Sequence, residues 1–122
     1  MSDIDARAVI HETARLAEDV VIEPFAMIGP GVEIGRGTVI GSMALVEKNT
    51  HIGEGCCISH GAVVGTDPQD LKYEKESTFL RIGDRTTIRE FATVNRATHD
   101  GEATIIGSDS LIMAYAHVAH NC

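Results

Sequence analysis

The sequence predicts an all-β fold, a parallel β-helix of six-residue repeats. Between Ile28 and Gly65 an aliphatic residue recurs at every sixth position, and a small or β-branched residue usually follows it four positions later. A period of six fits neither an amphipathic helix, with its period of 3.6, nor a simple strand, with its period of two. A fixed repeat instead indicates stacked coils, in which three hexapeptides form the three sides of each coil.

The repeat keeps one phase over eleven hexapeptides, and its aliphatic residues are expected to point inward as a stacked core. They are Ile4, Ile10, Leu16, Ile22, Ile28, Ile34, Ile40, Val46, Ile52, Ile58 and Val64. The small slot is filled throughout by Ala, Val, Thr or Cys, which leaves room at the crowded wall of the prism. Glycines and Pro30 fall where the chain must turn a corner.

Two interruptions break the repeat, and each is predicted to form a loop extruded from the prism. The first covers 66–81, where Asp70 and Glu76 stand in place of inward aliphatics. Loops of this length in a compact domain are usually functional. The second covers 99–104. The repeat resumes after each one, giving under six coils in total, with inward residues Ile82, Ile88 and Val94, then Ile106, Ile112 and Val118.

The chain ends at Cys122 inside a hexapeptide, without a polar cap. Terminal repeats usually need such a cap, so residues 1–122 are expected to be a β-helix domain at the front of a longer protein.

Composition excludes several classes of function. The formal net charge is −8, from 10 basic and 18 acidic residues, which argues against binding to nucleic acid or to an anionic membrane surface. The N-terminus lacks the basic start and apolar run of a signal peptide, and no stretch approaches the roughly 20 apolar residues of a spanning helix. The three cysteines, Cys56, Cys57 and Cys122, outline no disulfide framework. We expect a cytoplasmic protein without membrane insertion.

Two short segments carry groups suited to chemistry. His117-Val118-Ala119-His120 places two imidazoles around one corner, and histidine transfers protons well near neutrality. Two histidines alone under-fill a zinc shell of four ligands. In the first loop, Gln69-Asp70-Leu71-Lys72-Tyr73 offers an amide, an anion and a cation that suit a sugar and a phosphate. Asn95-Arg96 is a further candidate contact for an anion. For each group, a merely solvated side chain is the alternative.

The hexapeptide array, the Gln69–Tyr73 motif, Ile82-Gly83-Asp84-Arg85, Ile88-Arg89-Glu90 and the segment from Leu111 to His120 together resemble the acyl-ACP–UDP-N-acetylglucosamine O-acyltransferase family. The resemblance covers the whole chain. It implies a left-handed β-helix, a homotrimer with active sites in the clefts between subunits, and the first step of lipid A biosynthesis. The implied reaction moves a (R)-3-hydroxyacyl group from acyl carrier protein to the 3-hydroxyl of UDP-N-acetylglucosamine, with neither metal nor cofactor.

The same resemblance assigns roles to individual residues. His120 is implied as the general base, and Gln69, Asp70, Lys72 and His117 as substrate-binding residues. Two positions depart from the family pattern. Asn121 stands where a carboxylate is often found, and Asn95 stands where other members carry histidine. Both are expected to contact substrate or orient a neighbour as amides that cannot titrate.

Three alternatives remain open from the sequence. They are the sister N-acyltransferase that acts on a UDP-3-O-acylglucosamine, a zinc-dependent hydratase with the hexapeptide fold, and a structural β-helix without catalysis.

Overall fold

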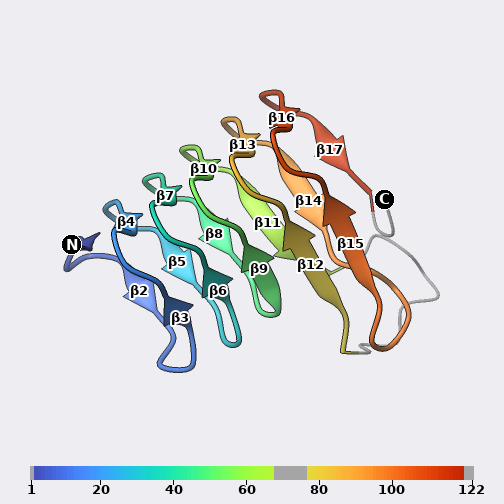
Figure 1. Ribbon diagram of the computed structural model, residues 1–122, viewed down its shortest axis with the longest axis horizontal. Coiled ribbons are helices and arrows are strands. Elements are labelled where there is room, and N and C mark those ends of the chain that lie inside the picture. The colour runs from blue at the N-terminus through green and yellow to red at the C-terminus, as the bar shows by residue number, and fades with distance from the viewer. Residues whose placement is uncertain (1, 68–76, 120–122) are drawn as a thin grey trace.

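The computed structural model describes residues 2–67 and 77–119, which form a three-sided prism of parallel β-sheets (Figure 1). The coils follow one another in sequence order along the longest axis of the molecule. Within the described residues, seventeen short strands, three to a coil, make five complete coils and two sides of a sixth. No described segment forms a helix with the length and apolar character needed to cross a membrane.

Each side of the prism is one sheet, named here A, B or C. Sheet A contains β1 (Asp3–Ile4), β4 (Val21–Ile22), β7 (Val39–Ile40), β10 (Cys57–Ile58), β13 (Thr87–Ile88) and β16 (Leu111–Ile112). Sheet B contains β2 (Val9–Ile10), β5 (Met27–Ile28), β8 (Leu45–Val46), β11 (Val63–Thr66), β14 (Thr93–Asn95) and β17 (His117–Val118). Sheet C contains β3 (Arg15–Leu16), β6 (Glu33–Ile34), β9 (Thr50–Ile52), β12 (Phe79–Ile82) and β15 (Ala103–Ile106).

The core is a stack of the predicted inward aliphatics. In sheet A, for example, Ile40 pairs with Ile58, and Ile58 pairs with Ile88, so like side chains lie directly above one another. All three are fully buried. The small slot is buried as well in the middle of the prism, as at Ala26 and Ala62, whereas Ala8 and Ala14 near the N-terminal end are half-buried. The six-residue period therefore predicted the fold correctly, because it equals one side of the prism.

Both interruptions occur at the corner between sheets B and C, and the strands extend further into them than the sequence pattern indicated. Strand β11 continues to Thr66 and β12 starts at Phe79, while β15 already starts at Ala103. The reason is that the strands that follow the two loops pair with each other. Phe79–Ile82 pairs over four residues with Ala103–Ile106, which extends both strands toward the loops.

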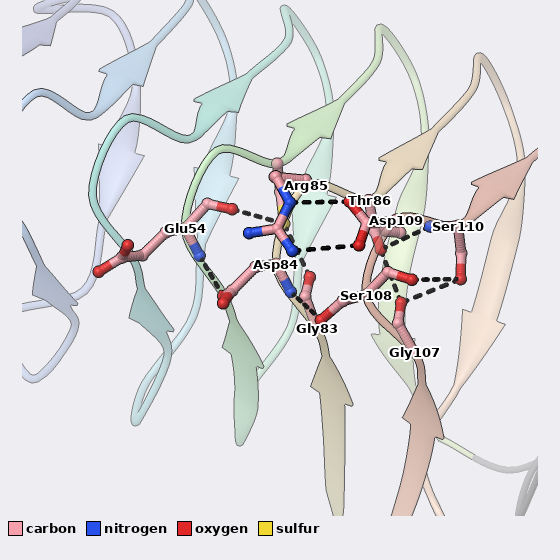
Figure 2. A network of polar contacts seen from close by, with 10 residues as sticks. Glu54, Gly83, Asp84, Arg85, Thr86, Gly107, Ser108, Asp109 and Ser110 are labelled. Carbon is pink, nitrogen blue, oxygen red and sulfur yellow. Dashed lines mark hydrogen bonds and ion pairs between the residues drawn. The ribbon is translucent and has the colours of Figure 1, made fainter.

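At the corner between sheets C and A, polar side chains tie three successive coils together (Figure 2). The carboxylate of Asp84 accepts a hydrogen bond from the backbone N–H of Glu54 at 2.8 Å, and the N–H of Asp84 donates to Ser108 Oγ at 2.9 Å. Arg85 forms an ion pair with Asp109, with Nε 2.7 Å from Oδ1. This hydrogen bonding by Arg85 holds the pKa of Asp109 below its ordinary value. The Asp84-Arg85 motif thus has a structural use at this corner.

The two described cysteines are free thiols with different environments. Cys56 is buried in the small slot, and its Sγ donates to the carbonyl of Gly83 at 3.0 Å. Burial raises the pKa of the Cys56 thiol. Cys57 is half-buried on the outer face of sheet A, in register with Val39 and Thr87. A buried, reduced Cys56 agrees with the prediction from the repeat.

Candidate functional site

The outer face of sheet B changes character along the prism. One outward residue from each strand forms a column in register, which we call the B-face column: Val9, Met27, Leu45, Val63, Thr93 and His117. The first four members are aliphatic and the last two are polar. The change occurs at the coil that follows the first interruption, on the strand next to β11, from which the chain leaves the prism.

His117 lies at that polar end, with its side chain exposed. Val118 faces the interior, which directs His117 outward, because successive residues of a strand face opposite sides. The ring Nδ1 lies 2.8 Å from Oγ1 of Thr93 on the neighbouring strand β14. This contact occupies one ring nitrogen and leaves Nε2 for a ligand. The arrangement suits hydrogen bonding to a polar substrate.

The next coil fixes the first root of the long loop, which is the point near Asp67 where the chain leaves the prism. The amide nitrogen of Asn95 donates to Thr66 Oγ1 at 2.7 Å and to the carbonyl of Asp67 at 2.9 Å. The guanidinium of Arg96 donates to the carbonyl of Gly65 and forms an ion pair with the carboxylate of Asp67. Asn95 and Arg96 are both buried. A buried arginine held in this way fixes the point at which the chain leaves the prism.

The second root is fixed by the same coil. The backbone N–H of Ser77 donates to Asp100 Oδ1 at 3.0 Å, and the carbonyl of Ser77 accepts from Gly101 at 2.9 Å. Two residues later, the N–H of Phe79 donates to the carbonyl of Glu102 at 2.9 Å. Both ends of the first loop are therefore anchored to residues 95–102, at the corner between sheets B and C. Strand β17 ends at the same corner.

Asn95 and Arg96 were expected as a candidate contact for an anion. One anionic group that Arg96 contacts is the carboxylate of Asp67 in the same chain, and contact with a substrate stays a prediction. The amide nitrogen of Asn95 is likewise engaged at the loop root. Asn95 Oδ1 has no hydrogen-bond partner among the described residues and is the part of this side chain left to accept a bond.

Of the predicted site residues, the structure describes Asn95 and His117. Gln69, Asp70, Lys72, His120 and Asn121 lie outside the described residues. Their roles stay predictions.

A groove of about 360 Å³ lies on the outer face of sheet B and reaches the loop root. Its aliphatic wall comes from Val9, Met27 and Leu45, and its polar end from Lys48, Asp67 and Arg96. It thus combines an apolar floor with charged groups at the corner between sheets B and C. The histidine end of the B-face column lies further along the same sheet.

Sequence reasoning missed Thr93, Thr66 and Asp67, which hold His117 and the loop root. The available signal was position within the repeat. Thr93 and His117 both directly precede an inward valine, so both face outward from their sides of the prism. Once the expected loop at 99–104 is left out, three hexapeptides separate these two positions, which is one coil, so the sequence also indicated that they share a sheet.

The fold and the histidine-bearing face define the class of the chain: a left-handed parallel β-helix of hexapeptide repeats. Residues 13–48 match the family described as bacterial transferase hexapeptide (six repeats).

Over its full length the chain is homologous to the N-terminal portion of acyl-(acyl-carrier-protein)–UDP-N-acetylglucosamine O-acyltransferases. It is 43% identical to the enzyme of Chlamydia pneumoniae over 122 residues, which is all of this chain and 44% of the relative. It is 51% identical to the enzyme of Chlorobaculum tepidum, covering 46% of that relative. The crystal structure of UDP-N-acetylglucosamine O-acyltransferase from Moraxella catarrhalis superposes with a TM-score of 0.94 at 40% identity, over 98% of this chain and 47% of the other. The chain thus spans about half the length of the relatives it matches.

Proposed function

We propose that the protein is an acyltransferase that moves a (R)-3-hydroxyacyl group from acyl carrier protein to the 3-hydroxyl of UDP-N-acetylglucosamine, at the start of lipid A biosynthesis in the cytoplasm. The observation that carries this proposal is identity of 43 to 51% to enzymes of this name over every residue of the chain. The polar end of the B-face column and the anchored loop roots are consistent with a site at this corner.

In the proposed reaction, the sugar's 3-hydroxyl oxygen attacks the carbonyl carbon of the thioester. The new C–O bond forms as the C–S bond breaks, and the carrier protein leaves as its thiol. A neutral hydroxyl is a poor nucleophile, so a base must take its proton. His120 is the proposed base, and a positioned base of this kind commonly contributes about 10²–10⁴ in rate.

The remaining site residues would bind and orient the sugar nucleotide. Asp70, Lys72 and Gln69 supply an anion, a cation and an amide from the loop that the Asn95–Arg96 anchor fixes at its root. His117 offers Nε2, and Asn121 is adjacent to the proposed base. Holding the substrate in a reactive geometry is itself a large part of catalysis.

A homotrimer is part of the proposal. The B-face column exposes aliphatic side chains, with Val9 and Met27 60% and 50% accessible. Exposed aliphatic residues that continue along one face are typical of an interaction surface. The column also leads to His117, so packing of a neighbouring subunit on this face would bring a second wall beside the histidine.

The experiment is a turnover assay of the full-length protein with a 3-hydroxyacyl carrier protein and UDP-N-acetylglucosamine. His120→Ala is expected to remove nearly all turnover while binding of the sugar nucleotide persists, because the base acts in the chemical step. Asp70→Ala and Lys72→Ala are expected to weaken binding mainly. Near-native turnover of His120→Ala would remove this residue from the mechanism and make His117 the next candidate base.

The same preparation separates the alternatives. Acylation of a UDP-sugar with a 3-amine, in preference to the 3-hydroxyl, would identify the sister N-acyltransferase. Stoichiometric, tightly bound zinc would favour the hydratase. An absence of UDP-N-acetylglucosamine binding would leave a structural β-helix.

A further inference from the structure

From the contact between strands β14 and β17 we infer that Thr93 is a positioning residue. It holds the imidazole of His117 through Nδ1, so that Nε2 is the nitrogen presented to the sugar nucleotide. This inference rests on the proposed function for the identity of the ligand. The geometry on which it depends is that of the chain alone.

The contact is well suited to orient the ring. Thr93 and His117 are direct cross-strand neighbours in register, and Oγ1 lies 2.8 Å from Nδ1, within ordinary hydrogen-bond distance. A hydroxyl can either donate to an imidazole nitrogen or accept from it. In either direction the bond restrains the rotation of the ring and keeps Nδ1 turned toward Thr93, so Nε2 is the nitrogen that remains for a ligand.

The neighbours of Thr93 make this contact its only polar interaction along the B-face column. On its other side lies Val63, whose side chain offers neither a donor nor an acceptor. The earlier members of the column are aliphatic too. In the B-face column, the hydroxyl of Thr93 therefore occurs at the position directly beside His117.

Packing alone does not account for threonine at this position. Thr93 is half-buried on an outer face, where valine has the same shape and an equally good preference for strands. Thr87 gives a matched comparison, because it occupies the equivalent outward position on sheet A, half-buried between Cys57 and Leu111, with no imidazole beside it. If outward threonines served only the strand, Thr93→Val and Thr87→Val would behave alike.

The test uses the full-length protein and four variants: Thr93→Val, Thr93→Ser, Thr87→Val and His117→Ala. Thr93→Val is expected to raise the Kd for UDP-N-acetylglucosamine about two- to tenfold, the size of one neutral hydrogen bond. The corresponding rise should fall on KM, while kcat changes little. Thr93→Ser keeps the hydroxyl and should restore binding, and Thr87→Val should bind as the parent does. In the His117→Ala background, Thr93→Val should have no further effect, because its partner is already gone.

A second measurement is independent of any substrate. The ring-nitrogen chemical shifts of His117, measured by NMR, should move in Thr93→Val and stay in place in Thr87→Val. Unchanged shifts, or additive effects of Thr93→Val and His117→Ala, would overturn the inference. If the parent protein binds no UDP-N-acetylglucosamine, the proposed function fails by itself, and the NMR result still decides whether Thr93 orients the histidine.

Discussion

Gly65 lies so close to Thr50 that a Cβ atom on the glycine would come within 2.0 Å of the threonine Oγ1. The two residues come from successive coils, and Gly65 immediately precedes Thr66, to which Asn95 is bonded. Its φ angle of +86° lies in the left-handed region that side chains disfavour. The backbone at the loop root is thus shaped by the absence of a side chain.

Gly65→Ala should therefore destabilise the fold by about 3 kcal/mol, through backbone strain together with the clash against Thr50. Gly37→Ala is the matched control. Gly37 has a similar φ of +74°, but a Cβ there meets nothing within 4 Å, so only the backbone term of about 1 kcal/mol remains. Urea denaturation of both variants measures the difference. Equal losses would show that the contact with Thr50 relaxes freely.

Position along the stack should decide the cost of removing an inward aliphatic. Ile58 is fully buried in the middle of sheet A, and Ile58→Ala should cost about 2–5 kcal/mol. Ile4 occupies the same slot of the repeat in β1 but is 43% exposed, so Ile4→Ala should cost about 1 kcal/mol. Thermal or urea unfolding monitored by circular dichroism compares them. Similar losses would contradict a core built by stacking.

The ion pair between Arg85 and Asp109 should add stability only above acidic pH. The pKa of Asp109 is lowered in the folded state, so its contribution is fully present above the unfolded value of about 3.9 and is lost as pH falls through the lower folded value. Asp109→Asn should be slightly less stable than the parent at pH 7, and the two should converge near pH 2. Both side chains are exposed, so 1 M salt should also reduce the difference. A difference that persists at pH 2 and in salt would assign the effect to something other than charge.

The two neighbouring cysteines should differ in reactivity. Cys57 should react with iodoacetamide in the folded protein, since its side chain is partly accessible on sheet A. Cys56 should react only after unfolding, because burial both blocks access and raises its pKa, which leaves little thiolate. Peptide mapping by mass spectrometry after alkylation at pH 8 reads out both sites. Alkylation of Cys56 at the rate of Cys57 would show that the wall of the prism opens readily.

Sequence reasoning predicted the coils and the core well, because one short period determines which residues face inward, as at Ile40, Ile58 and Ile88. It did not identify the contact between Thr93 and His117, although their separation of 24 residues is one coil of eighteen plus the six residues of the expected loop at 99–104. The repeat places the two residues side by side but does not specify that their side chains form a hydrogen bond. Which outward residues become neighbours depends on how many residues each loop removes from the prism. Where the strands re-enter is decided by pairing such as that of Phe79 with Ala103, which the repeat does not encode.

The anchoring of both loop roots has a consequence for how such a protein can change. The chain leaves the prism at Asp67 and returns at Ser77, and both points are bonded to residues 95–102 of the next coil. The ladder on either side is therefore preserved whatever number of residues lies between these points, and doubling that number costs only about 0.6 kcal/mol in closure entropy. The prism and the insert between Asp67 and Ser77 are in this sense separate modules. An insert can be exchanged or lengthened while the prism that carries it keeps its register.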